Sequence, residues 1–227
     1  MEEIVKELLE GNRVHASAFD GEFDALQKEQ RPPAVTVCCS DSRVLQNQMW
    51  NNEKPGRIFT CGNIGNRVIE LLDGEPVISG DVLYPLAHTH TRVAIIVGHT
   101  ACGAITGAYN DLVHGIEDHP GIKHCLTVLE SDLADALELL PPDITDETAI
   151  NYLVEYNVDR QIEHLEHSDA VPEDTTILGG VYDFCDVYPG KRGEIHLINI
   201  GGDRDVASLR EQHPEIADRI RRRWQYR

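Results

Sequence analysis

Two short segments of the chain carry side chains that can bind a metal, and each segment follows an apolar run. Cys39 opens a Cys-Ser-Asp-Ser-Arg segment, and His99 and Cys102 bracket a His-Thr-Ala-Cys segment. Two thiolates and one imidazole are the ligands of an open zinc site, which keeps a fourth position for water. A closed structural site would need a fourth protein ligand, so the pattern indicates a catalytic centre. Asp41 and Arg43 would lie beside that water.

The elements that must position these segments alternate between strands and helices. Apolar, β-branched runs predict strands, and apolar residues at helical spacing predict helices. We expect strands at 34–39, 57–61, 92–98, 175–184 and 194–199, helices at 1–10, 80–86, 122–140 and 146–166, and a further helix from Cys102. This order predicts an α/β fold, a mainly parallel β-sheet flanked by α-helices, in a single domain over residues 1–227. Both metal-binding segments then lie at the carboxyl edge of the sheet, where ligands collect.

Each candidate ligand has a plainer interpretation when it is taken alone. A cysteine such as Cys39 is often a small buried hydrophobe. The zinc prediction depends on convergence, because both segments follow strands and Cys102 would begin a helix whose N-terminus favours a thiolate. His88 and His90 alternate near a strand, but no third ligand stands at a fixed offset from them. We therefore expect these histidines to be surface or core residues.

The composition limits the partners of the chain. Acidic residues number 39 and basic residues 20, of which 15 are arginine, and the net charge is −19. Such a field disfavours nucleic acid and anionic membranes as partners, and we interpret it as adaptation to a salty interior. The acidic N-terminus lacks the features of a signal peptide, and no apolar run approaches the roughly 20 residues of a membrane span. We expect a cytoplasmic protein with reduced thiols.

The end of the chain, from Arg219 to Tyr226, is basic and aromatic in contrast to the rest. Nucleic-acid binding there is disfavoured by the charge of the whole protein. We expect a C-terminal helix that docks on an acidic neighbouring subunit.

At these residues the chain resembles the β-class carbonic anhydrases, and the resemblance runs nearly from end to end. The paired Cys-x-Asp-x-Arg and His-x-x-Cys motifs, in this order and far apart, are specific to that family. The matching segments are 8–12, 39–44, 55–56, 62–66, 98–103, 157–161 and 179–183.

The resemblance implies a zinc enzyme that reversibly hydrates carbon dioxide to bicarbonate. Its implied zinc ligands are Cys39, His99 and Cys102, with Asp41 and Arg43 as an orienting dyad. Family members pair as dimers, often in larger assemblies, with pockets at the dimer interface, so we expect a homodimer or a dimer-based homo-oligomer.

The same resemblance indicates a substrate pocket of the plant type. The family's pocket glutamine, phenylalanine and tyrosine align with Gln30, Phe59 and Tyr84. A regulatory tryptophan found in one bacterial branch aligns with Thr36, so we expect no inhibitory bicarbonate site. Gly62 stands where the family usually has an arginine, which affects local contacts at that turn.

Two rival functions remain open from the sequence. An enzyme of the same architecture could hydrolyse carbonyl sulfide or carbon disulfide, because the zinc chemistry is shared; Gln30 favours an oxygen substrate. A zinc protein without activity that binds bicarbonate is the other rival, and the presence of both Asp41 and Arg43 argues against it.

Overall fold

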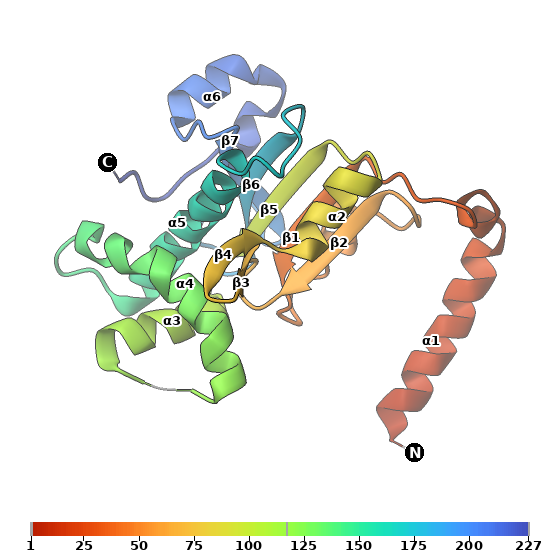
Figure 1. Ribbon diagram of the computed structural model, residues 1–227, viewed down its shortest axis with the longest axis horizontal. Coiled ribbons are helices and arrows are strands. Elements are labelled where there is room, and N and C mark those ends of the chain that lie inside the picture. Colours follow the sequence, from red (N-terminus) through yellow and green to blue (C-terminus); the bar gives the residue numbers. More distant parts are fainter. Residues whose placement is uncertain (1, 117, 227) are drawn as a thin grey trace.

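A computed structural model describes residues 2–116 and 118–226 of the chain, arranged around a five-stranded sheet (Figure 1). The elements are α1 (Glu3–Phe19), the 3₁₀ helix η1 (Asp20–Leu26), β1 (Ala34–Cys39), η2 (Gln48–Trp50), β2 (Ile58–Asn63), β3 (Ile69–Leu72), β4 (Glu75–Ile78), α2 (Gly80–His88), β5 (Val93–His99), α3 (Gly103–His114), α4 (Pro120–Leu139), α5 (Asp146–Glu166), β6 (Thr176–Asp183), β7 (Glu194–Ile200), α6 (Val206–Gln212) and η3 (Pro214–Arg219). No helix within these residues is both long and apolar enough to cross a membrane.

The sheet has the strand order β2-β1-β5-β6-β7. Strands β2, β1, β5 and β6 are parallel, and β7 pairs with β6 in the antiparallel direction. The prediction of a mainly parallel sheet flanked by helices is confirmed. Because β1 and β5 are adjacent and parallel, their carboxyl ends lie side by side.

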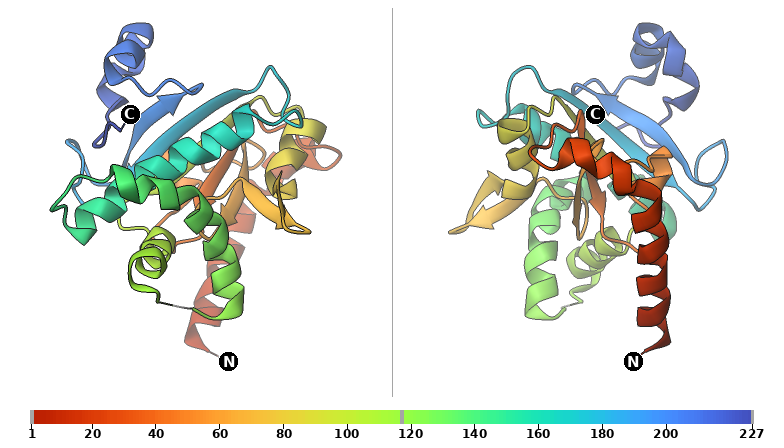
Figure 2. Two further views of the ribbon diagram at one scale, coloured as in Figure 1. Left: turned by 60° about the vertical axis from the view of Figure 1, so that its left-hand side comes forward. Right: turned by 90° about the vertical axis from the view of Figure 1, so that its right-hand side faces the viewer.

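Helix α5 lies across one face of the sheet, and α3 and α4 pack beyond it (Figure 2). Two glycines permit this close approach. A Cβ atom at Gly98 on β5 would lie 2.9 Å from side-chain atoms of Val154 and Val158, and one at Gly179 on β6 would lie 2.4 Å from Ile162. The main core forms here because alternate strand residues, such as Val37 and Ile96, point to the α5 face.

Helix α1 and the strands β3 and β4 differ from the sequence prediction. Helix α1 continues through Gly11 to Phe19, whereas we expected it to stop at residue 10. It extends away from the sheet (Figure 1), and none of its described side chains is buried. The antiparallel pair β3–β4 was not predicted, because a strand of only four residues is too short for a periodic signal.

The prediction for the C-terminal end was wrong. Residues 220–226 form no helix, and they dock on α5 of the same chain. Arg222 is buried between Glu155 and Asp159, and its Nη2 forms an ion pair with Asp159. Backbone amides of Arg223 and Trp224 donate to the Glu155 carboxylate at 2.7 and 2.9 Å. The basic C-terminal end therefore finds its acidic partner on α5 of the same chain.

Candidate metal centre

The three predicted ligands converge at the carboxyl edge of the sheet. Cys39 and His99 are the last residues of the adjacent strands β1 and β5, and Cys102 is the N-cap of α3. One ligand atom from each lies within 4.8 Å of the other two, and all three residues are buried. In the described part of the chain, no other group of three or more such residues could hold a metal ion.

The His99 ring presents one nitrogen to this centre. Its Nδ1 lies 3.0 Å from the carbonyl oxygen of Thr100, which can only accept a hydrogen bond, so Nδ1 carries the proton. Nε2 therefore has its lone pair free, and it is buried with no hydrogen-bond partner among the described residues. A buried acceptor without a partner is costly, and a bound cation satisfies it.

The two sulfurs of the centre lie next to each other. The Cys102 thiol lies 4.0 Å from the Cys39 sulfur and donates toward it. This hydrogen bond, more than any other contact, lowers the pKa of Cys39 to about 4. The same hydrogen bond to Cys39, together with burial and the charge on Cys39, raises the pKa of Cys102, although the amides of Ile105 and Ala104 at the start of α3 partly oppose that effect. Two buried sulfurs and one buried imidazole nitrogen are ligands that fit zinc.

Asp41 and Arg43 form a bidentate ion pair beside this centre. Nε and Nη2 of Arg43 donate to Oδ1 and Oδ2 of Asp41 at 2.9 and 2.6 Å. Asp41 Oδ2 also lies 3.8 Å from Nε2 of His99. The hydrogen bonds from Arg43 hold the pKa of Asp41 well below its usual range, so the carboxylate is an acceptor at any working pH.

The backbone between His99 and Cys102 is held by a residue that we did not predict. Ala101 has a left-handed φ of 51°. Its N–H donates to the side-chain oxygen of Asn151 at 3.0 Å, and its carbonyl accepts from Arg43 Nη2 at 3.2 Å. Asn151 is a polar residue on the buried face of α5, which is the only sequence signal that could have identified it.

The glycine-rich turn after β2 also reaches the site. A hydrogen bond from the Gly65 amide is among the contacts that lower the pKa of Cys39. Asn157 donates to the Gly65 carbonyl at 3.1 Å, and Gln161 accepts from the Val68 amide at 2.8 Å. At Gly62, a Cβ atom would lie 2.5 Å from the amide nitrogen of Gln46, so that side chain occupies the space beside the turn.

The residues expected to bind substrate lie near the starts of the parallel strands, at the end of the sheet opposite the metal ligands. Phe59 pairs with Val35, four residues before Cys39 on the same strand, which is roughly 13 Å at 3.3 Å per residue. The ring of Tyr84 on α2 lies 6.2 Å from that of Phe59. Gln30 precedes β1 and lines a cavity of about 640 Å³ together with Tyr84. Within one chain, these side chains are not brought to the metal ligands.

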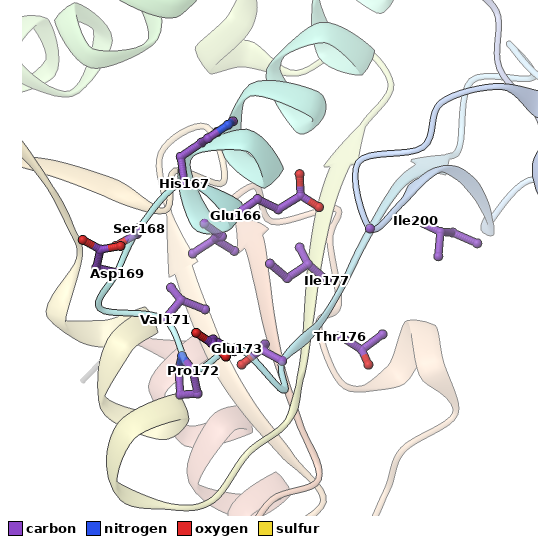
Figure 3. Close-up of a pocket in the computed structure, with 13 residues that line it drawn as sticks. Glu166, His167, Ser168, Asp169, Val171, Pro172, Glu173, Thr176, Ile177 and Ile200 are labelled. Carbon is purple, nitrogen blue, oxygen red and sulfur yellow. The ribbon is translucent and has the colours of Figure 1, made fainter.

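A larger cavity, of about 860 Å³, also lies away from the metal ligands (Figure 3). Glu166, His167 and Thr176 line it, near the end of α5 and the start of β6. Because β6 is parallel to β5, its start is at the edge opposite His99. This cavity contains none of the predicted site residues.

A sheet of this topology with a cysteine–histidine–cysteine centre at its carboxyl edge defines an α/β metalloenzyme. The chain belongs to the carbonic anhydrase family, because the model of that family matches residues 34–188. Its fold is that of the β class, it is a lyase of the carbonate dehydratase type, and its cofactor is zinc.

Individual relatives agree with this assignment. The carbonic anhydrase of Pseudomonas aeruginosa is 28% identical over 221 residues, which cover 95% of this chain and 94% of the relative. A tetrameric β-carbonic anhydrase of Sordaria macrospora superimposes with a TM-score of 0.72 at 21% identity, over 87% of this chain and 98% of that structure. The β-carbonic anhydrase of Coccomyxa, in complex with acetazolamide, has a TM-score of 0.68 at 21% identity, over 95% of this chain and 98% of that structure.

Proposed function

We propose that this enzyme reversibly hydrates carbon dioxide to bicarbonate, with Cys39, His99 and Cys102 as the zinc ligands. The observation that carries the proposal is the position of Asp41. Its Oδ2 lies 3.8 Å from Nε2 of His99, which has no hydrogen-bond partner among the described residues, and Arg43 binds both of its oxygens. A carboxylate so placed serves a reaction whose nucleophile is a water molecule next to the metal position.

Zinc bound by these three residues supplies Lewis-acid chemistry, which lowers the pKa of a coordinated water toward neutrality. The chain's own contribution is orientation. Asp41 remains ionised, so its Oδ2 accepts a hydrogen bond from the attacking water and directs the oxygen lone pair at the substrate carbon. Arg43 fixes the carboxylate in that orientation, because its two nitrogens bind the two oxygens in one plane.

We further propose that Gln30, Phe59 and Tyr84 bind substrate in the site of a second copy of the chain. Their position at the opposite end of the strands agrees with this, since in a two-fold pair a residue of one chain can contact a different residue of the other chain, and the reverse contact then also forms. The Gln30 amide donates a hydrogen bond to an oxygen of carbon dioxide or bicarbonate. The Phe59 and Tyr84 rings, 6.2 Å apart, provide an apolar wall for an uncharged substrate.

Helix α1 supports an oligomer independently. Ile4, Leu8, Leu9 and Val14 are exposed by 56, 66, 55 and 67%. A helix with no buried side chain is only marginally stable in water, so another surface must cover its apolar residues. We propose that this surface belongs to a second copy in a homodimer or a dimer-based assembly.

The free cysteines of the described chain also favour a reducing, cytoplasmic location.

The reaction is tested by stopped-flow measurement of carbon dioxide hydration with metal analysis on the same sample. We expect hydration in proportion to zinc content. Hydrolysis of carbon disulfide with negligible hydration of carbon dioxide would show that the enzyme acts on sulfur substrates. A zinc-loaded protein with neither activity would instead indicate a protein that only binds bicarbonate.

The shared site is tested by mixing two inactive variants. Cys102→Ala lacks the metal and Tyr84→Ala lacks the proposed pocket. If each site combines the metal of one chain with the pocket of another, random mixed dimers recover about a quarter of the wild-type activity. Full activity of Tyr84→Ala alone, or no recovery on mixing, would contradict the shared site.

A further inference from the structure

The ring of Phe184 contacts both the His99 imidazole and the Arg43 guanidinium. Its centroid is 5.6 Å from that of His99, with 25° between the ring planes. The Cζ atom of Arg43 lies 4.7 Å from the same centroid. We infer that Phe184 is a positioning residue, whose aromatic face holds the Arg43 guanidinium in the orientation that binds Asp41.

Arg43 needs such a support because it is half exposed. Its side chain is 50% accessible, compared with 16% for Asp41. Its hydrogen bonds to Asp41 and to the Ala101 carbonyl lie in the guanidinium plane, and such bonds leave the two flat faces free. A long side chain loses rotamer freedom when it is fixed, and a stacked aromatic face offsets part of that cost.

The structure holds Phe184 itself firmly. Its backbone N–H donates to Oγ1 of Thr100 at 3.2 Å, and that hydroxyl donates to Asp183 at 3.3 Å. Asp183 is 2% exposed and also accepts the amides of Cys185 and Tyr188 at 3.0 and 2.8 Å. The ring of Tyr182 packs edge-on against Phe184 at 5.8 Å. The aromatic face is thus fixed to the residue that follows His99.

This geometry separates the role of Phe184 from simple packing. A leucine fills similar space, but it has no π face for a cation, whereas a tyrosine keeps that face. If Phe184 acts through Arg43, then an aromatic side chain at residue 184 is needed to keep the Arg43 guanidinium in one conformation. The kinetic part of this inference rests on the proposed function; the order of Arg43 does not.

The test compares Phe184→Leu and Phe184→Tyr with the wild-type holoenzyme. In spectra of protein with ¹⁵N-labelled arginine, the Arg43 Nε–H signal is assigned by its loss in Arg43→Lys. We expect this signal to be protected from solvent exchange in the wild type and in Phe184→Tyr, and to exchange rapidly in Phe184→Leu. For carbon dioxide hydration, Phe184→Leu should lower kcat roughly 3- to 30-fold with little change in KM, and Phe184→Tyr should restore it.

Two controls isolate the role. Tyr152→Leu removes another stacked ring, 5.5 Å from Trp224 and outside the site, and should leave the Arg43 signal unchanged. In an Arg43→Met background, Phe184→Leu should cause no further loss of kcat, because residues that act as a unit are not additive.

Four results would overturn the inference. The first is an Arg43 Nε–H signal that stays protected in Phe184→Leu, and the second is a kcat of Phe184→Tyr as low as that of Phe184→Leu. The third is a further loss of kcat when Phe184→Leu is added to Arg43→Met. The fourth is loss of zinc from Phe184→Leu, which would mean that Phe184 acts on His99. If the wild type hydrates no carbon dioxide, the proposed function fails, while the arginine spectra still decide the role of Phe184.

Discussion

Arg43 donates three hydrogen bonds to Asp41, two residues earlier in the chain. Its backbone amide and Nε donate to Oδ1, both at 2.9 Å, and Nη2 donates to Oδ2 at 2.6 Å. Oδ1 is therefore fully used within the pair, and Oδ2 is the oxygen that faces His99 at 3.8 Å. The pair fixes which carboxylate oxygen meets a reactant at the metal centre.

The zinc ligands can be tested by removal of one sulfur. Cys102→Ala should lose both zinc and activity, because two protein ligands do not hold the ion as three do. Cys125→Ala, at a partly buried cysteine of α4, is the matched control and should keep both. Metal analysis on the two purified variants decides the matter. Full zinc occupancy of the Cys102→Ala variant would show that Cys102 is not a zinc ligand.

Asp41→Asn should lower turnover roughly 10- to 100-fold while zinc stays bound. The amide keeps the shape, but it lacks the negative charge that accepts the hydrogen bond from water. Asp186→Asn, which breaks an exposed ion pair with Arg192 outside the site, is the control. A fully active Asp41→Asn enzyme would rule out the role of the pair.

Because its pKa is lowered, Asp41 should not contribute to the pH dependence of activity in the working range. Because this folded-state pKa lies below the ordinary value, the carboxylate stays charged above its unfolded pKa of about 3.9, and the benefit is lost only as pH falls further. Activity should rise from mildly acidic to alkaline pH, through titration of the water and not of Asp41. An acid limb that disappears in Asp41→Asn would contradict this.

Bicarbonate should act as a product and not as an allosteric inhibitor. Thr36 stands where the regulatory tryptophan aligns, fully buried on β1 between Thr60 of β2 and Ile95 of β5. A bicarbonate titration at fixed pH and ionic strength should give hyperbolic inhibition. A sigmoidal loss of activity would show that a second bicarbonate site exists.

Arg222→Met should destabilise the fold by about 3–5 kcal/mol, because it leaves buried carboxylates without their cation. Glu155 and Asp159 are exposed by 0 and 4% in their side chains, so water cannot replace the guanidinium. Urea unfolding measures the effect, with Arg192→Met as an exposed control that should change little. Neutralising the acids with Glu155→Gln and Asp159→Asn should recover part of the loss. Unchanged stability of Arg222→Met would exclude a structural role for the C-terminal segment.

Salt should raise the melting temperature of the protein. A net charge of −19 makes the folded state repel itself, and the screening length falls from about 30 Å at 0.01 M to about 3 Å at 1 M salt. Thermal unfolding between dilute buffer and molar potassium chloride tests this. A melting temperature that stays constant or falls with salt would contradict the interpretation of adaptation to a salty interior. It would not affect the assignment of the zinc site.

The sequence by itself determined the strands of the five-stranded sheet, the long helices and the three metal ligands. Apolar runs such as 93–98 signal buried parallel strands, because both faces of such a strand are covered. Chain direction then brings their ends to one edge, so Cys39 and His99 could be assigned to one site before any contact was known. Asp41 and Arg43 followed because they are close to Cys39 in the chain.

Only the tertiary structure decided which residues support that site and where the others lie. Asn151 and Phe184 reach the His-x-x-Cys segment from α5 and from the end of β6, across separations that no local pattern records. The structure also docks the basic C-terminal end on α5 of its own chain, because buried Glu155 and Asp159 require a cation. Gln30, Phe59 and Tyr84 share a family pattern with the metal ligands, but they stand at the other edge of the sheet. Periodicity specifies the face and direction of an element, whereas side chains from distant elements meet only through packing.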